Sequence, residues 1–299
     1  MNRVIGLAAA VFLAAVAACW AASGQELAMQ GFRAVEQGEY EKAADLLTRA
    51  VESGEFTEKL RSRVYNNRAN AYYRMGEPRK ALQDYTRAIE LDERNGVAYF
   101  NRGTMHFNRG DLGKALQDLN ASIEIRPDNA SALTQRGRVF FQRERYERAI
   151  RDFGKAIERN GKMAEPYLNR GLARAHIGKS SLALEDLTKA LQIRPEYPKA
   201  LYNRGAVYDN MGKKDKALRD YTRVIELDPE HAAAYFSRAM IRYDREKYRK
   251  ALNDFRQAVD LDPDNAKAYY YRGMTWQKLG KKERAKADVQ RALDLGFEG

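Results

Sequence analysis

The chain repeats itself every 34 residues, and this period constrains the fold more than any other feature. Arginine, alanine and aspartate each occupy a fixed place in seven successive units. The three series are Arg68, Arg102, Arg136, Arg170, Arg204, Arg238 and Arg272; Ala81, Ala115, Ala149, Ala183, Ala217, Ala251 and Ala285; and Asp84, Asp118, Asp152, Asp186, Asp220, Asp254 and Asp288. A constant period of this length is typical of stacked units, each of which buries its apolar face against its neighbours.

Each unit is predicted to form two helices joined by a tight turn. In the unit 198–231, Leu201 and Tyr208 belong to one apolar stripe at helical spacing, and Leu218 and Ile225 belong to a second. The segment "GKKD" separates the stripes, and Pro229 prevents the second helix from continuing. Asparagines such as Asn129 are placed to cap the helix that follows. We therefore expect an all-α protein.

The pattern within the unit resembles the tetratricopeptide repeat family. That family expects a bulky residue, a small residue, an aromatic residue, alanine, a second aromatic residue and proline at fixed offsets. Here these are Leu201, Gly205, Tyr208, Ala217, Tyr221 and Pro229, with Val224 where a further alanine is usual. The resemblance implies a right-handed α-solenoid of about eight helix-turn-helix hairpins over residues 25–299. The implied repeats are about 25–61, 62–95, 96–129, 130–163, 164–197, 198–231, 232–265 and 266–299.

The last unit differs from the others at one position on its second helix. Six units have leucine or isoleucine after the alanine of the series, whereas the last unit has Lys286. A polar residue on the face that would receive another repeat is what a solvent-facing terminal unit requires. We therefore expect the array to stop there.

Residues 1–24 have the pattern of a secretory signal peptide, with Arg3 followed by an uncharged run from 4 to 22. The single cysteine, Cys19, lies in "VAAC", which resembles a bacterial lipobox and makes Cys19 a lipidation candidate. Three outcomes stay open: cleavage before Cys19, cleavage near "AASGQ", and retention as an anchor. All three predict an exported protein of the bacterial envelope, either periplasmic or a membrane-anchored lipoprotein.

The repeated arginines are predicted to pair with the repeated aspartates. Each arginine precedes an aspartate by 16 residues, and two antiparallel helices bring residues at such matched distances from their turn side by side. The pairs are Arg68 and Asp84, Arg102 and Asp118, Arg136 and Asp152, Arg170 and Asp186, Arg204 and Asp220, Arg238 and Asp254, and Arg272 and Asp288. Because the pair recurs unchanged, a structural role is favoured over recognition of a ligand.

In the tetratricopeptide family the first helix of each unit lines a concave groove. By resemblance, the groove carboxamides are Asn67, Asn101, Gln135, Asn169 and Asn203, and the groove aromatics are Tyr73, Phe100, Phe107, Phe141, Tyr202, Phe236, Tyr243 and Tyr270. Amides that offer donors and acceptors beside aromatics suit an extended peptide. The alternative is that the amides satisfy neighbouring helix ends and the aromatics pack between units.

The predicted function is therefore a non-catalytic scaffold or adaptor that binds an extended protein or peptide segment. The net charge of +12 suggests an alternative, a basic scaffold for anionic polymers, nucleic acid or a membrane surface. The export signal disfavours nucleic acid as the partner. An anionic membrane surface is a further partner that the charge allows.

No motif for catalysis, a metal or a cofactor emerges from the sequence. The three histidines, His106, His176 and His231, lack the spacing of metal ligands. The segment "GKS" at 178–180 lacks the preceding glycine and strand of a phosphate-binding loop. We therefore expect no enzymatic activity, no metal and no cofactor.

Overall fold

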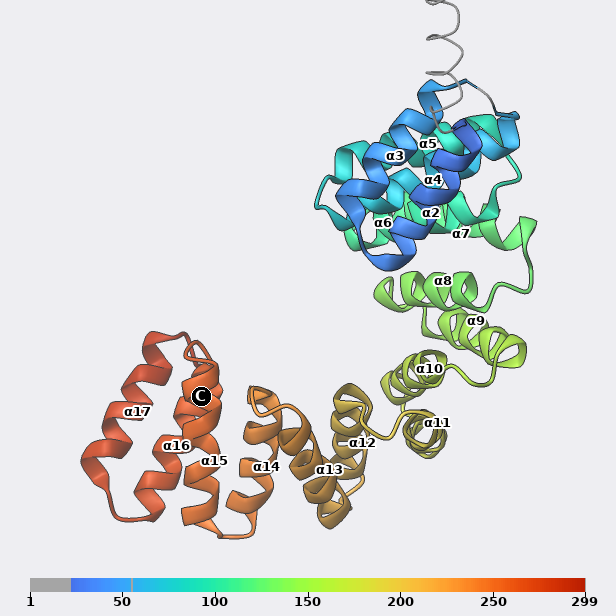
Figure 1. Ribbon diagram of the computed structural model, residues 1–299. Coiled ribbons are helices and arrows are strands. Elements are labelled where there is room, and N and C mark those ends of the chain that lie inside the picture. Colours follow the sequence, from blue (N-terminus) through green and yellow to red (C-terminus); the bar gives the residue numbers. More distant parts are fainter. Residues whose placement is uncertain (1–22, 55, 299) are drawn as a thin grey trace, which may run out of the picture. The chain divides into compact units, whose positions relative to one another are not determined.

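The computed structural model describes residues 23–54 and 56–298 of the 299-residue chain, so Cys19 and nearly all of the predicted signal peptide lie outside the described residues. Sixteen α-helices and no strand occur in the part that is described (Figure 1). They are α2 (Gly24–Gln37), α3 (Tyr40–Glu52), α4 (Glu58–Arg74), α5 (Pro78–Leu91), α6 (Gly96–Asn108), α7 (Leu112–Ile125), α8 (Ala130–Gln142), α9 (Tyr146–Arg159), α10 (Ala164–His176), α11 (Ser180–Ile193), α12 (Pro198–Asn210), α13 (Lys214–Leu227), α14 (Ala232–Asp244), α15 (Tyr248–Leu261), α16 (Ala266–Lys278) and α17 (Lys282–Asp294).

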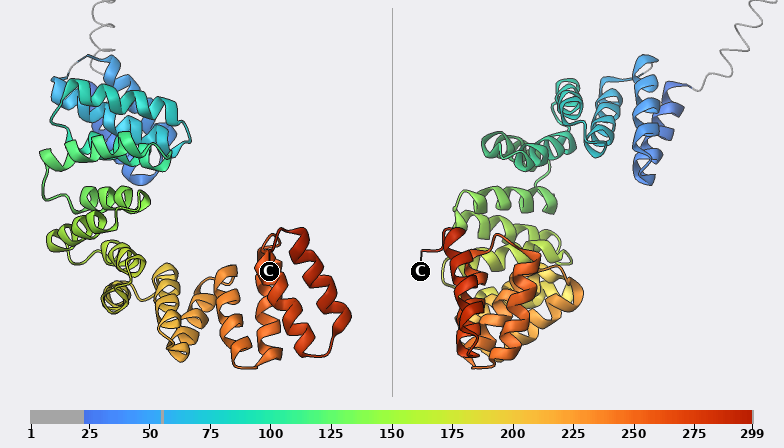
Figure 2. Two further views of the ribbon diagram at one scale, coloured as in Figure 1. Left: turned by 180° about the vertical axis from the view of Figure 1, so that it is seen from behind. Right: turned by 90° about the vertical axis from the view of Figure 1, so that its left-hand side faces the viewer.

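The helices belong to two compact units, and the boundary between the units falls inside α8, after Val139. In the first unit α2 pairs with α3, α4 with α5, and α6 with α7, and α3 packs on α4 as α5 packs on α6. In the second unit the hairpins α10–α11, α12–α13, α14–α15 and α16–α17 follow one another, each packed on the next (Figure 2). The all-α repeat solenoid predicted from the period is confirmed.

Small residues let the two helices of a hairpin approach closely. All seven alanines of the repeated series are buried, and six of them are 0% exposed. In the hairpin α12–α13, a Cβ added at Gly205 would lie 2.8 Å from Cε1 of Tyr221. A contact of that length is not tolerated, so the aromatic ring of α13 depends on the glycine in α12.

The turn within each hairpin requires one residue in the left-handed region. Gly76, Gly110, Gly178, Gly212 and Gly280 have φ angles between 73° and 81°. The two units that lack this glycine place Glu144 and Glu246 there, each with φ of 57°. The left-handed conformation costs a residue with a Cβ roughly 1–2 kcal/mol. The stacked repeats therefore impose the turn on glutamate as well.

Side chains cap several of the first helices, as the asparagine pattern predicts. Oδ1 of Asn129 accepts from the backbone N–H of Ala132, and Oδ1 of Asn95 and Asn265 accept from Ala98 and Ala268. At α2, Ser23 and Glu26 form a reciprocal capping box. Among the described residues, no helix combines the length and the apolar composition that a membrane span requires.

Candidate functional site

The repeated arginines and aspartates lie within hydrogen-bond distance inside their own hairpins. In six of the seven pairs, Nε of arginine donates to Oδ2 and Nη2 donates to Oδ1, over 2.7–3.0 Å. The pairs are Arg68–Asp84, Arg102–Asp118, Arg170–Asp186, Arg204–Asp220, Arg238–Asp254 and Arg272–Asp288. Arg136 and Asp152 lie on opposite sides of the boundary after Val139, in different compact units, and their pairing stays a prediction.

Three of these arginines also contact the preceding hairpin. The remaining guanidinium nitrogen, Nη1, donates to a threonine hydroxyl on the second helix of the hairpin before: Arg68 to Thr48, Arg102 to Thr86, and Arg238 to Thr222, over 3.0–3.2 Å. The arginine thus joins two helices of one hairpin and ties that hairpin to its neighbour. The sequence pattern did not reveal this link, although threonine recurs at the place concerned.

The carboxamides predicted to line the groove do not behave alike. Nδ2 of Asn67 donates to the backbone of Arg63, and Nδ2 of Asn203 donates to the backbone of Lys199, each within its own helix. Gln135 is only 6% exposed, so it lies in the interior rather than in an open groove. Amide nitrogens of Gln135 and Asn169 are buried without a hydrogen-bond partner among the described residues. An open ladder of equivalent amides is therefore not what the structure shows.

Asn101 belongs instead to a cluster of side chains between α4 and α6. Its Nδ2 donates to Oδ1 of Asn66 at 3.0 Å and to Oδ1 of Asn70 at 3.2 Å. Oδ1 of Asn70 also accepts from the hydroxyl of Tyr85 at 2.6 Å, and burial raises the pKa of Tyr85, so the phenol remains a neutral donor. Both acceptor oxygens are thereby used within the cluster.

Most of the predicted groove aromatics pack between helices. In the first unit, Phe100 and Phe107 lie against the buried cluster of Ala115, Leu119 and Val139. Tyr73 is the more open member, with 38% of its surface exposed, and its hydroxyl accepts a hydrogen bond from Asn108 at 2.8 Å. The predicted groove surface in this unit is therefore more amide than aromatic.

In the second unit the aromatics likewise contact one another. Ring centroids lie 5.6 Å apart for Tyr202 and Tyr221, and 5.8 Å apart for Phe236 and Phe255. The remaining three meet other rings: Phe141 meets Tyr146 and His176, Tyr243 meets Tyr248 and Tyr271, and Tyr270 meets Tyr271 and Phe297. Part of the aromatic surface is thus buried in packing between repeats, which is the alternative that the sequence left open.

A polar cleft of about 590 Å³ opens beside α4 in the first unit. One helix supplies a row along its wall, since Lys59, Arg63, Asn66, Asn67 and Asn70 follow one another at spacings of three, four or one residue. Such spacings place side chains on one face of a helix. The start of α6 and the turn before it also line the cleft, with Val97, which is 40% exposed, and Asn95, which caps α6.

Positive charge dominates this cleft. Four cations line it, namely Lys59, Arg63, Arg94 and Arg126, and the only carboxylate among the lining residues is Asp92. Oδ1 of Asp92 already accepts the backbone N–H of Arg94 at 3.0 Å. The positions that line the groove in this family could have identified Arg63, Asn66 and Asn70, which are the second, fifth and ninth residues of their repeat. Arg94 and Arg126 lie outside the helices and gave no such signal.

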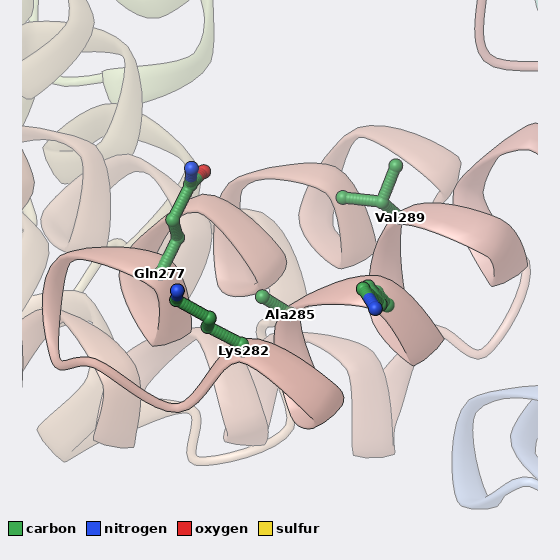
Figure 3. A pocket seen from close by; sticks show the side chains of 5 residues that line it. Gln277, Lys282, Ala285 and Val289 are labelled. Atoms are coloured by element: carbon green, nitrogen blue, oxygen red, sulfur yellow. The ribbon is translucent and has the colours of Figure 1, made fainter.

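A second hollow lies on the last hairpin, and its volume is about 310 Å³. Gln277 of α16 and Lys282, Ala285, Lys286 and Val289 of α17 line it (Figure 3). The side chain of Lys286 is 78% exposed, and Leu293 on the same helix is 54% exposed.

His106 is the one histidine with a buried side chain among the described residues, being 6% exposed. Its Nδ1 lies 3.6 Å from Asp111 and its Nε2 lies 4.0 Å from Asp118. Desolvation lowers the pKa of His106, although both carboxylates act in the opposite direction. Within the described ranges no group of three or more histidine, cysteine, aspartate or glutamate residues could hold a metal ion.

Solved structures resemble this arrangement. YrrB, described as a TPR protein with an unusual peptide-binding site, is 26% identical with a TM-score of 0.52 and covers 63% of this chain and 97% of its own. PilF of Pseudomonas aeruginosa is 20% identical with a TM-score of 0.64, over 70% of this chain and 94% of that one. A tetratricopeptide repeat protein from Parabacteroides merdae is 23% identical with a TM-score of 0.62, over 87% and 98%. The last two show the fold alone.

Family models match the sequence over most of its length, whereas no curated protein matches it. Models described as tetratricopeptide repeat match residues 62–95, 97–129, 134–198 and 198–231, and one described as TPR repeat matches 239–280. The matches at 62–95 and 198–231 coincide with repeats of the 34-residue period. The chain belongs to the tetratricopeptide repeat proteins.

Proposed function

We propose that this protein is a non-catalytic scaffold that binds an extended segment of a partner protein along the first-helix face of its repeats. The observation that carries the proposal is the amide cluster of Asn66, Asn70 and Asn101 at the cleft beside α4. A cleft of about 590 Å³ accommodates several residues of chain. The peptide-binding site named for YrrB supports the same use of a related fold.

Amide donors suit such a ligand because the backbone of an extended segment presents carbonyl oxygens whatever its sequence. Neither Asn66 nor Asn70 donates a side-chain hydrogen bond within the described residues. Asn70 is partly exposed, so its NH₂ group is available to a carbonyl oxygen of a partner, whereas Asn66 is only 5% exposed and its role is to hold Asn101. Val97, which also lines the cleft, offers an apolar contact to the side chains of the bound segment.

The proposed setting is the bacterial envelope, after export directed by residues 1–24. The support is the charge and hydropathy pattern of that segment. Mass spectrometry of the mature protein from membrane and periplasmic fractions tests the setting. A lipidated N-terminus at Cys19 that is lost in Cys19→Ala supports the lipoprotein form, and an intact Met1 in the cytoplasmic fraction contradicts export.

Site-specific photo-crosslinking tests the binding site. A photoreactive phenylalanine analogue replaces Val97 inside the cleft or, as a control, Arg79, an exposed residue of α5 outside the cleft. We expect cross-linked partner bands from position 97 and none from position 79. The bands should disappear when Asn70 and Asn101 are both changed to alanine. Equal labelling from both positions, or none from position 97, would overturn the proposal.

A further inference from the structure

Four cations line the cleft beside α4, and a single carboxylate, Asp92, lines it with them. Among the described residues, Lys59, Arg63, Arg94 and Arg126 make no ion pair, whereas many other cations of the protein do. Arg63 contacts a ring instead, since its guanidinium lies 5.8 Å from the ring centroid of Phe32. A group of unpaired cations around one cleft attracts anions and rejects cations.

One amide of the same cleft, that of Asn70, presents a donor rather than an acceptor. Oδ1 of Asn66 and Oδ1 of Asn70 both accept from Asn101, and Tyr85 donates to Asn70 as well. Oδ1 of Asn70 therefore accepts two hydrogen bonds inside the protein, whereas the NH₂ group of Asn70 makes none among the described residues and is free to bind a ligand. A ligand that binds here must supply hydrogen-bond acceptors. A carboxylate supplies two acceptor oxygens together with a negative charge.

The charges and the amides occupy different parts of α4. Lys59 and Arg63 lie one turn apart toward the start of the helix, and Asn66, Asn67 and Asn70 follow over the next two turns. From Lys59 to Asn70 the helix rises by about 16 Å. Because the cations are spread over α4, the turn before α6 and the end of α7, they fit several anionic groups along a chain better than one compact anion.

We infer that the cleft selects an acidic segment, in which neighbouring aspartate or glutamate side chains face Lys59, Arg63, Arg94 and Arg126 while the adjoining backbone contacts Asn70. This inference rests on the proposed function, since it names the class of segment that the scaffold binds. The amide contacts fix the position of the segment, and the unpaired cations set its composition.

Affinity selection from a random dodecapeptide library tests the inference with the whole protein. One variant combines Lys59→Gln with Arg63→Gln, and a control with the same loss of charge combines Arg79→Gln with Lys114→Gln, two exposed cations outside the cleft. We expect wild-type and control to enrich peptides with adjacent acidic residues, and the cleft variant to lose that enrichment. A selected peptide should bind the cleft variant about tenfold more weakly than the control.

The outcomes separate the two proposals. Selected peptides without acidic enrichment would overturn the inference and leave the proposed function standing, whereas failure to select any peptide would count against both. Acidic enrichment that survives in the cleft variant would also overturn the inference. Vesicles of phosphatidylglycerol serve as a further probe, and binding of vesicles through the cleft without binding of acidic peptides would show a lipid partner instead.

Discussion

Arg204 donates two hydrogen bonds to the carboxylate of Asp220, from Nε to Oδ2 and from Nη2 to Oδ1, and each measures 2.8 Å. Arg204 lies on α12 and Asp220 on α13, so the pair joins the two helices of one hairpin. The side chains are only 20% and 8% exposed, which limits screening by water. The partner also raises the pKa of Arg204, which therefore keeps its charge.

Removal of either partner should destabilise the protein, and the effects of the two substitutions should not be additive. Arg204→Ala and Asp220→Ala should each lower the free energy of unfolding by about 1.5–3 kcal/mol, because each leaves a partly buried charge without its partner. The double variant should cost less than the sum by about 1 kcal/mol or more. Urea unfolding measures all three, with Arg219→Ala, an exposed cation of α13, as a control expected to change little. Strict additivity would contradict a structural pair.

Close approach of α12 and α13 yields a second prediction. A Cβ at Gly205 would lie 2.8 Å from Cε1 and 3.0 Å from Cδ1 of Tyr221, a ring that is only 2% exposed. Gly205→Ala should therefore lower the free energy of unfolding by about 1–3 kcal/mol.

Gly154 in α9 provides a matched comparison, because its added Cβ would meet only Nη1 of Arg170, at 3.7 Å. Gly154→Ala should raise the free energy of unfolding by up to about 1 kcal/mol through higher helix propensity. Thermal unfolding of both variants measures the difference. The same sign of change in both would contradict the steric argument.

The fold could be predicted from the sequence because the same pattern recurs in seven successive repeats. Each unit repeats the small residues that permit close packing and the charges that join the helices, so one misjudged residue does not alter the result. Even Glu144 and Glu246, which lack the conformational freedom of glycine, adopt the turn that the flanking helices impose. That outcome follows from the repeat pattern and not from the local residue.

The candidate site was less predictable, because it depends on which hydrogen bonds the side chains make. Position in the repeat treats Asn67, Asn101 and Asn203 as equal, yet two of them bind their own helix and only Asn101 reaches across to its neighbours. The sequence also does not show which cations lack an ion pair. Arg63 and Arg94 can be recognised as unpaired only when the positions of the surrounding carboxylates are known. Such properties arise from contacts between neighbouring repeats, which the sequence of one repeat does not reveal.

The left-handed turns give a third prediction. Glu246 has φ of 57° where other repeats place glycine, and the left-handed conformation costs a residue with a Cβ roughly 1–2 kcal/mol. Glu246→Gly should therefore raise the free energy of unfolding by up to about 1 kcal/mol, after the greater entropy of glycine in the unfolded chain is subtracted. Gly212→Glu, at the equivalent turn with φ of 73°, should lower it by a similar amount. Urea midpoints that fall for both variants would contradict strain at Glu246.

A last prediction concerns the pH dependence of stability at His106. The equivalent position holds Arg174 and Arg242 in two other repeats, and their Nη1 atoms donate to the paired aspartates Asp186 and Asp254 at 2.7 and 2.6 Å. His106 makes no such bond: Nε2 lies 4.0 Å from Asp118 of α7, and Nδ1 lies 3.6 Å from Asp111 in the turn. Two cations also lie near His106. Arg102, on the same helix, opposes its protonation, and Lys114 of α7 lines a small surface hollow together with His106.

Burial lowers the pKa of His106 below its ordinary value of 6.5. The folded protein then binds this proton less readily than the unfolded chain does, so the contribution of His106 to stability is present above pH 6.5 and is lost as the pH falls below it. His106→Tyr, which introduces the residue found at the equivalent positions 72 and 208, should flatten that part of the curve. Urea unfolding of both proteins across this pH range measures the slope. An unchanged slope in the variant would assign the pH dependence to other groups.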